Sequence, residues 1–505
     1  MTEHRRDPYA EKFGAYRWYA LGLLAFINLL NYLDRNVIFA LFEPIKRDLH
    51  LSDTQLGWLG SAYILVFSLA ALPLGVLSDI RSRRAVIAGG VAIWSAFTSL
   101  GGIVRNYWQL FVCRSAVGLG EAAFGPASAS LVADYFPGRR RAFAMGLLSS
   151  GVAIGGVLGI LLGGQLEALY GWRVAFMLVG IPGLICASLA ARLRDPTRTY
   201  ARIGLRAHIR KVEIGVVAVV RYAWPLLLGT IAGIGAAFWL QTRQGPDATV
   251  DLAVVGIGVG LGLAGSIIKW VRVVQAPASA NVEEAEIAEE MSDAFGEMVH
   301  AGRVVLHTPT LVYVFLGGAL ISFGMNGLVG WGPTFVAREL GLSMAQSAVL
   351  LGKWGLIAGT AGTLAGGWVA DQLRDRFASG RVLTVAIGFV LGVPLAMMGL
   401  LERDLQHFVM LFTAAFFFLS WYNGPLTAVI FDVVPARITA TVSGVYLLFI
   451  HLAGDAIAFP LVGALSDQFG IAQAVLLLPM VSLGGGLVTL IATRTVGRDM
   501  ARYPT

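Results

Sequence analysis

The sequence predicts an all-α polytopic membrane protein: two six-helix bundles as parallel repeats, plus two extra transmembrane helices in the central loop, 14 spans in total. Three observations predict this class. Of the 505 residues, 56% are hydrophobic and only 14% are charged, whereas soluble domains contain about 25% charged residues. Fourteen apolar stretches approach the ~20 residues that a transmembrane helix needs. The last six stretches also repeat motifs of the first six.

The N-terminal bundle is expected over residues 18–192 and the C-terminal bundle over 308–493. The first six spans fall at about 18–41, 55–77, 85–104, 109–133, 140–166 and 172–192. The last six fall at about 308–336, 345–370, 381–400, 406–431, 438–464 and 472–493. A stripe of small residues in the fifth span, Gly151, Gly155 and Gly159, predicts close helix packing.

The segment 193–307 joins the two bundles and breaks their symmetry. It opens with a basic run and holds the two extra apolar stretches, at about 214–240 and 250–271. An acidic stretch at 283–297 follows and is compatible with a surface helix. We interpret the segment as a cytoplasmic linker with an inserted pair of transmembrane helices.

Basic residues gather in the loops on the N-terminal side of the membrane. These loops contain the Arg81–Arg84 cluster, the Arg139–Arg141 run and the basic start of the linker. On the opposite side, Lys46 and Arg47 are offset by nearby acids. Because loops rich in Lys and Arg stay in the cytoplasm, we expect cytoplasmic segments at 1–17 and 494–505. The expected location is the plasma (inner) membrane, with the first span as the anchor.

Internal repetition supports two equivalent bundles. Asp134-Tyr-Phe-Pro recurs as Asp432-Val-Val-Pro, 298 residues later, at the same end of a fourth span. Asp79, which closes the second span, matches Asp371 at an offset of 292. Equal halves in the same orientation imply parallel repeats, and transporters place their site between such halves, near the middle of the membrane.

Charged side chains inside two spans of the first bundle mark the candidate site. Asp34 and Arg35 interrupt the first span, while Arg114 and Glu121 lie two helical turns apart in the fourth. At ~1.5 Å per residue, Asp34, Arg35 and Arg114 lie about 9–10 Å below the outer ends of their helices. Since buried charges are costly in a bilayer, we predict one network of two acids and two bases. Two alternatives stay open: a helix end in contact with water at Asp34, or a static structural salt-bridge cluster.

The loop after the second span has the pattern of a conformational latch. It reads Gly75-Val-Leu-Ser-Asp79-Ile-Arg-Ser-Arg83-Arg84. Gly75 lets a neighbouring helix approach, and Asp79 can accept hydrogen bonds from a helix N-terminus. Arg83 and Arg84 can pair with acids in one conformation and release them in another. The alternative is a basic loop with no gating role.

This loop resembles the signature between the second and third helices of the major facilitator superfamily. The resemblance implies the major facilitator fold and secondary active transport. The second copy, which includes Asp371, is looser, and Asp375 stands at the position that matches Arg83. That substitution argues against a symmetric second latch.

The charged motifs resemble the spinster-like branch of this superfamily. Asn-Tyr-Leu-Asp34-Arg35 lies in the first span, and Arg114 with Gly-Glu121-Ala lies in the fourth. The resemblance implies proton-coupled transport of a lipid-like amphiphile, such as a lysophospholipid or a sphingoid phosphate. It assigns proton coupling to Asp34 and Glu121, with Arg35 and Arg114 as charge partners or head-group ligands.

The second bundle contains its own ionisable residues. Lys353 lies about 12 Å below the outer end of its helix at ~1.5 Å per residue, and we expect it to bind an anionic head group. His451 and Asp455 are four residues apart, on one helix face, where a histidine can relay protons. Alternatively, Asp455 lies near the outer surface and His451 is a hydrogen-bonded packing residue.

Other function classes fit the sequence less well. It contains no nucleotide-binding loop, no metal-ligand cluster and no credible nucleophile with a base, so we expect neither an enzyme nor a cofactor or metal. A proton-coupled transporter of a small organic anion is the main alternative, and a membrane receptor or enzyme scaffold is a remote one. The expected partners are the substrate, protons and the bilayer, with no nucleic acid, and the expected state is a monomer.

Overall fold

The computed structural model describes residues 14–80, 82–136, 140–195, 300–435 and 438–502, with a few isolated positions between 228 and 265. The chain divides into two units, Met1–Thr197 with His300–Thr505, and Arg198–Val299. The predicted helix pair at 214–240 and 250–271 and the acidic stretch belong to the second unit. They lie almost entirely outside the described residues.

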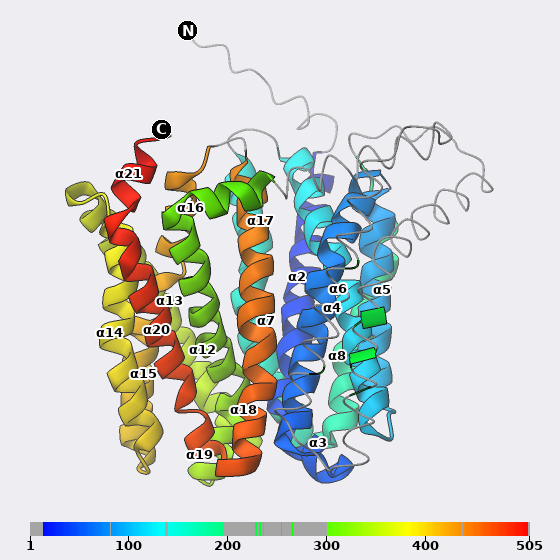
Figure 1. The fold of residues 1–505 in the computed structure, drawn as a ribbon. Helices are drawn as coiled ribbons and strands as arrows, with labels where there is room; N and C mark the ends of the chain where they lie inside the picture. Colours follow the sequence, from blue (N-terminus) through cyan, green and yellow to red (C-terminus); the bar gives the residue numbers. More distant parts are fainter. Residues whose placement is uncertain are drawn as a thin grey trace. The chain divides into compact units, whose positions relative to one another are not determined.

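Within residues 14–195, six long helices and one short helix form the N bundle (Figure 1). The long helices are α2 (Tyr16–Ala40), α4 (Asp53–Ile80), α5 (Arg83–Gly101), α6 (Tyr107–Tyr135), α7 (Arg141–Tyr170) and α8 (Trp172–Ala190). The short helix α3 (Phe42–Leu49) directly follows α2. The six long helices coincide with the first six predicted spans.

Residues 300–502 form the C bundle, whose fourth and fifth spans are interrupted. Its helices are α12 (Pro309–Glu339), α13 (Met344–Arg376), α14 (Gly380–Leu401), α15 (Leu405–Leu419), η2 (Ser420–Tyr422), α16 (Pro425–Val433), α17 (Thr439–Ile450), η3 (His451–Asp455), α18 (Ala456–Phe469), α19 (Ile471–Ala474), α20 (Leu477–Ile491), η4 (Ala492–Arg494) and α21 (Val496–Met500). The fourth span breaks before Pro425, whose ring nitrogen has no hydrogen to donate. The fifth span contains a π-helical turn, η3.

Twelve helices in the described part of the chain are long and apolar enough to cross a bilayer. This confirms the prediction of an all-α polytopic membrane protein, while the two further predicted spans lie in the part that is not described. α2 begins and α21 ends on one side of the unit, which we call the terminus side (Figure 1). α3 and α19 lie on the opposite side, the α3 side.

The predicted glycine stripe packs α7 directly against the backbone of α2. A Cβ atom added to Gly155 would lie 2.4 Å from the carbonyl oxygen of Leu29. One added to Gly159 would lie at the same distance, 2.4 Å, from the carbonyl oxygen of Leu33. Any side chain there would therefore push the two helices apart and move the charged residues of α2.

The two bundles meet through close contacts near the α3 side. A Cβ atom on Gly57, early in α4, would lie 2.3 Å from the carbonyl oxygen of Phe459 in α18. In the equivalent contact of the other repeat, a Cβ atom on Gly164 of α7 would lie 3.0 Å from the Cα atom of Ala345 in α13. The ring of Phe39 also stacks on that of Phe459, with centroids 5.0 Å apart. These contacts close the unit at the α3 side.

Candidate transport site

The first buried ion pair joins α2 to α6. Arg114 donates from Nη1 to Oδ1 of Asp34 over 3.2 Å. The Thr98 hydroxyl, from α5, donates to the other carboxylate oxygen of Asp34. Asp34 is 2% exposed and Arg114 is 1% exposed. Three helices therefore hold this carboxylate away from water.

A second ion pair lies beside the first and also joins α2 to α6. Arg35 donates to Oε2 of Glu121 from Nη2 over 3.0 Å and from Nε over 3.3 Å. The Glu121 side chain is fully buried, while that of Arg35 is 12% exposed. The four predicted residues thus come together, and each acid pairs with the base on the other helix. Neither acid pairs with the base of its own helix.

Some hydrogen-bonding capacity of this cluster is unused. Oε1 of Glu121 and both Nε and Nη2 of Arg114 are buried without a partner among the described residues. Buried polar atoms in native proteins nearly always have partners. The cluster can therefore accept a proton, a water molecule or a polar ligand group without first breaking both ion pairs.

A polar cluster of the C bundle surrounds Asp455, at the end of the π-helical turn. His451 Nδ1 lies 2.6 Å from Oδ2 of Asp455. Oδ1 accepts hydrogen bonds from Ser322 and, over 2.9 Å, from Asn326 Nδ2, both on α12. Asp455 is 2% exposed, so it does not lie at the surface. The Asp455 contact orients Nδ1 of His451, which leaves Nε2 to face other groups.

The structure does not bring Lys353 to either cluster. Its side chain is exposed on α13. Its ammonium nitrogen lies 5.1 Å from the ring centroid of Trp354, its neighbour in the chain. A head-group role for Lys353 thus remains a prediction.

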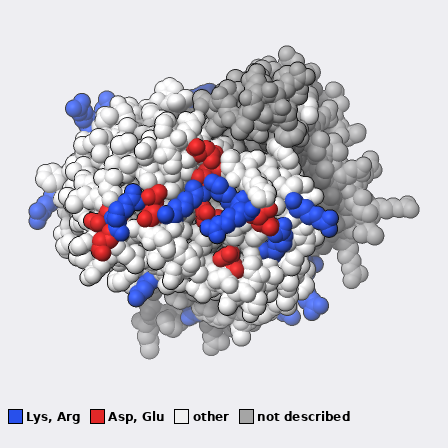
Figure 2. All heavy atoms as spheres, turned by 90° about the horizontal axis from the view of Figure 1, so that it is seen from below, with Lys and Arg blue, Asp and Glu red and all other residues white. Residues whose placement is uncertain are grey.

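An ion-pair cluster on the α3 side joins the bundles and was missed from the sequence. Arg338, near the end of α12, donates to both oxygens of Asp53, over 2.6 and 2.8 Å. It also donates to Glu43 over 2.7 Å, and Lys46 lies 2.5 Å from Asp53. Figure 2 shows acidic and basic side chains in a band across this face. We call Glu43, Lys46, Asp53 and Arg338 the α3-side gate.

Asp467, at the C-terminal end of α18, strengthens this closure by capping α4. Its carboxylate accepts from the backbone amides of Asp53 and Thr54, both over 2.8 Å. Ser466 adds a hydrogen bond to the Asp53 side chain over 2.6 Å. A carboxylate at a helix N-terminus satisfies free amides and complements the helix dipole. Two sequence signals were available. Arg338 lies close to the end of an apolar span, and a Gly-x-x-x-acid motif occurs in both repeats, as Gly163-x-x-x-Glu167 and as Gly463-x-x-x-Asp467.

On the terminus side, Arg83 joins α5 to α6 and to the segment that follows α8. It donates to Asp134 over 2.5 Å and to Ser130 over 3.0 Å, and it forms an ion pair with Asp195. Arg84 reaches the carbonyl oxygen of Leu193 over 3.4 Å. These contacts are internal to the N bundle, so they do not by themselves join the two bundles.

Two other residues of the predicted latch, Gly75 and Asp79, lie in α4, but their side-chain surroundings fall outside the described part of the chain. Asp371 is described, and its side chain is 75% exposed, 3.9 Å from Arg381. This exposed contact is weaker than the buried bonds of Arg83.

The C bundle has a contact equivalent to that between Arg83 and Asp134, but the arginine that makes it is not at the predicted position. Arg381 donates to Asp432 over 2.5 Å. Each of these residues lies 298 positions after its counterpart in the bond between Arg83 and Asp134. The equivalent of Arg83 is therefore Arg381, and the match to Asp375 was wrong. The segment from Asp371 to Arg381 is six residues longer than the segment from Asp79 to Arg83, so an alignment started from Asp371 ends short of the arginine.

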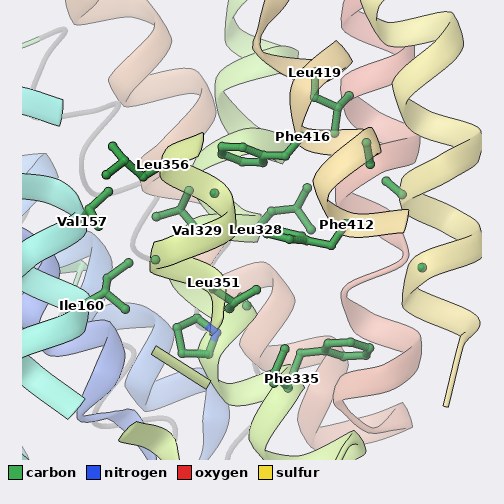
Figure 3. Close-up of a pocket in the computed structure, with 18 of the residues that line it drawn as sticks. Val157, Ile160, Leu328, Val329, Phe335, Leu351, Leu356, Phe412, Phe416 and Leu419 are labelled. Atoms are coloured by element: carbon green, nitrogen blue, oxygen red, sulfur yellow. The ribbon is translucent and has the colours of Figure 1, made fainter. Parts of the chain in front are cut away.

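An apolar cavity of about 290 Å³ lies between helices of both bundles. Figure 3 shows its walls: Val157 and Ile160 of α7, Leu328, Val329 and Phe335 of α12, Leu351 and Leu356 of α13, and Phe412, Phe416 and Leu419 of α15. Asn36, which follows Arg35 in α2, is the polar residue of this lining. The cavity therefore suits an apolar ligand group close to a polar one.

The family profile of the Major Facilitator Superfamily matches residues 24–454. The chain belongs to this superfamily. It is a membrane transporter and not an enzyme.

The chain is similar to transporters of several kinds. An MFS-type efflux pump of Mycolicibacterium smegmatis is 25% identical over 97% of this chain and 96% of its own length. Protein spinster homolog 1 of Xenopus tropicalis is 23% identical over 88% of this chain and 72% of its own length. The probable L-galactonate transporter of Escherichia coli is 32% identical, over 33% of this chain and 37% of its own length. The spinster relative confirms the predicted resemblance to the spinster-like branch.

Solved structures of the superfamily share the fold. A bacterial homologue of the human lysosomal transporter Spinster, in an inward-facing and unoccupied conformation, has a TM-score of 0.71 and 22% sequence identity, and the match covers 98% of each chain. This likeness confirms the predicted major facilitator fold of two six-helix bundles.

Proposed function

We propose that this chain is a proton-coupled secondary active transporter of a lipid-like amphiphile, working by alternating access. The observation that carries the proposal is the juxtaposition of two buried ion pairs with an apolar cavity at the bundle interface. Arg35 belongs to one pair, and its neighbour Asn36 lines the cavity. A charged head group and an apolar tail would thus find their partners within a short distance.

Protons act through the two carboxylates. Protonation of Glu121 removes the charge that holds Arg35, and protonation of Asp34 does the same for Arg114. Breaking a buried pair typically changes energies by ~3–5 kcal/mol, which is large enough to redistribute two conformations. A released guanidinium is then available to an anionic head group. His451 and Asp455 provide a second protonatable pair in the C bundle.

The contacts between the bundles indicate which side of the transporter is closed and must open during transport. The α3-side gate and the α4–α18 contact hold that side closed, so it must separate when the site opens there. Basic loops favour a cytoplasmic terminus side, with both termini in the cytoplasm and the chain in the plasma (inner) membrane. In this orientation the gate faces away from the cytoplasm. We expect the chain to act as a monomer.

A small organic anion is the second candidate substrate. The probable L-galactonate transporter among the relatives favours it, and the guanidinium groups of Arg35 and Arg114 suit a carboxylate. The apolar cavity favours the amphiphile, because a small hydrophilic acid gains nothing from apolar walls. Lys353, exposed on α13 of the C bundle, would attract either anion.

Reconstitution tests both candidates together. Purified protein in proteoliposomes receives an imposed pH gradient, and accumulation is measured for a lysophospholipid, a sphingoid phosphate and galactonate. We expect gradient-dependent accumulation of an amphiphile that a protonophore abolishes. Accumulation of galactonate alone would favour the second candidate, and transport that ignores the gradient would exclude proton coupling.

A pair of glycine variants tests the cavity. Gly156 lines the cavity, so Gly156→Leu is expected to slow amphiphile transport and leave galactonate transport unchanged. Gly146 lies on the same helix with nothing within 4 Å of an added Cβ atom, so Gly146→Leu is the matched control. Equal effects of both variants would remove the cavity from the proposal.

A further inference from the structure

Three aromatic rings surround the guanidinium of Arg35 in addition to its acidic partner. Its Cζ atom lies 4.6 Å from the ring centroid of Tyr32, 4.9 Å from that of Tyr63 and 5.0 Å from that of Phe67. A cation within about 6 Å of a ring face is attracted by the ring quadrupole, more strongly when water is excluded. Tyr63 and Phe67 are one helical turn apart on α4, so they face Arg35 together.

The same two rings contact other charged groups of the site. The ring of Tyr63 lies 5.7 Å from Cζ of Arg114, so it touches the guanidinium groups of both ion pairs. The ring of Phe67 meets that of His451 edge to face, with centroids 6.4 Å apart and an interplanar angle of 89°. Phe67 therefore links Arg35 of the N bundle to His451 of the C bundle through direct side-chain contact.

We propose that Tyr63 and Phe67 are positioning residues that keep Arg35 in place when Glu121 is protonated and transmit its state to the C bundle through His451. The inference rests on the proposed function, because it specifies how the Glu121 proton is coupled to bundle movement. The ring quadrupole does not change when Glu121 is protonated, so the rings still attract the Arg35 guanidinium after Glu121 becomes neutral. Without the rings, that guanidinium would then be buried without a partner.

Other charged or titratable groups of this site also contribute to any pH response. They are Tyr32 and Asp34 on α2, Tyr63 on α4, Arg114 and Glu121 on α6, and His451 and Asp455 in the π-helical turn. Since substitution of Phe67 leaves every one of them in place, a pH response that changes in a Phe67 variant reports the ring itself.

The test measures the conformational equilibrium without a substrate. Spin labels are placed on Leu169→Cys of α7 and Gln468→Cys of α18, which are exposed near the α3-side ends of the N and C bundles. The buried natural cysteines, Cys113 and Cys186, are replaced by alanine. Distance distributions from pulsed electron paramagnetic resonance are recorded across pH for the full chain in lipid nanodiscs.

Phe67→Leu removes the ring and keeps an apolar side chain, whereas Phe67→Tyr keeps the ring. We expect Phe67→Leu to move the midpoint of the pH transition about one pH unit lower, a tenfold change, because the protonated state loses a partner for the cation. Phe67→Tyr is expected to retain the wild-type midpoint. Phe67→Met, with a flexible apolar side chain, replaces the leucine variant if that variant does not fold.

The outcomes separate this inference from the proposed function. If the wild-type distances do not respond to pH, proton coupling itself fails, and the inference that rests on it fails too. If the wild type responds but Phe67→Leu and Phe67→Tyr share its midpoint, the positioning role is overturned while proton coupling stands.

Discussion

Removal of the Arg338 side-chain charge should open the α3 side. In Arg338→Gln, Asp53 loses two hydrogen bonds from the guanidinium, and Glu43 loses its contact with the C bundle. Asp53 keeps Lys46 and Ser466 as partners. The variant therefore weakens the closed conformation while Asp53 stays paired, and Glu43 keeps Arg47 at 4.0 Å.

The burial of Asp53 and Arg338 determines how much free energy the closed conformation loses in this variant. Exposed ion pairs contribute about 0–1 kcal/mol, and loss of one partner from a buried pair costs about 3–5 kcal/mol. The Asp53 side chain is 2% exposed and that of Arg338 is 23% exposed, which places this pair between the two cases. A loss of about 2 kcal/mol corresponds to a roughly 30-fold shift toward the conformation that is open at the α3 side.

A buried serine provides the assay. Ser61 is 0% exposed and donates to the carbonyl oxygen of Ala456 across the bundle interface over 2.8 Å. A cysteine placed there, with Cys113 and Cys186 replaced by alanine, reacts with a soluble maleimide only when the bundles separate. We expect Arg338→Gln to raise the labelling rate by roughly 30-fold at constant pH.

The matched control breaks an ion pair that does not cross the interface. Arg403 lies 2.5 Å from Glu339, both in the C bundle, and its side chain is 58% exposed. Arg403→Gln should leave the labelling rate unchanged. If Arg338→Gln labels at the wild-type rate, or Arg403→Gln accelerates labelling equally, the gate does not hold the α3 side closed.

Three further outcomes are expected. Asp34→Asn should abolish accumulation driven by a pH gradient in proteoliposomes while the thermal unfolding midpoint shows a folded protein; a fully coupled variant would contradict the assignment. Glu121→Gln should flatten the pH profile of transport, and an unchanged profile would leave Glu121 a structural role. Gly57→Ala places a Cβ atom 2.3 Å from the carbonyl oxygen of Phe459, so it should accelerate labelling of the reporter cysteine, whereas Gly22→Ala, with nothing within 4 Å, should not.

The cost of burying charge explains why the first site could be predicted from sequence. Asp34 and Arg114 lie in apolar spans at matching depths, and an unpaired charge at such depths is very costly. The structure brings both together with Arg35 and Glu121. Depth along a helix follows from residue count, but the direction in which a side chain faces a neighbouring helix does not. Which acid pairs with which base was therefore open.

The α3-side gate could not be predicted in the same way. Arg338 lies near the end of a span, where a basic residue ordinarily meets water, and its partners are 285 and 295 residues away in the chain. Nothing local links Arg338 to Asp53. Only the packing of α4 against α18 brings the first turn of α4 to the end of α12.

Hydropathy and helical spacing are properties of local segments, so the membrane class, the repeated halves and the buried charges that must find partners follow from the amino-acid sequence. The crossed pairing of Asp34 with Arg114 and of Arg35 with Glu121 follows only from the packing of the helices. The tertiary structure also decided that Arg381 is the counterpart of Arg83. These features depend on how the helices rotate and approach one another and on where loops of different length lead the chain. The spacing of residues along one helix encodes neither the helix orientation nor the path of a loop.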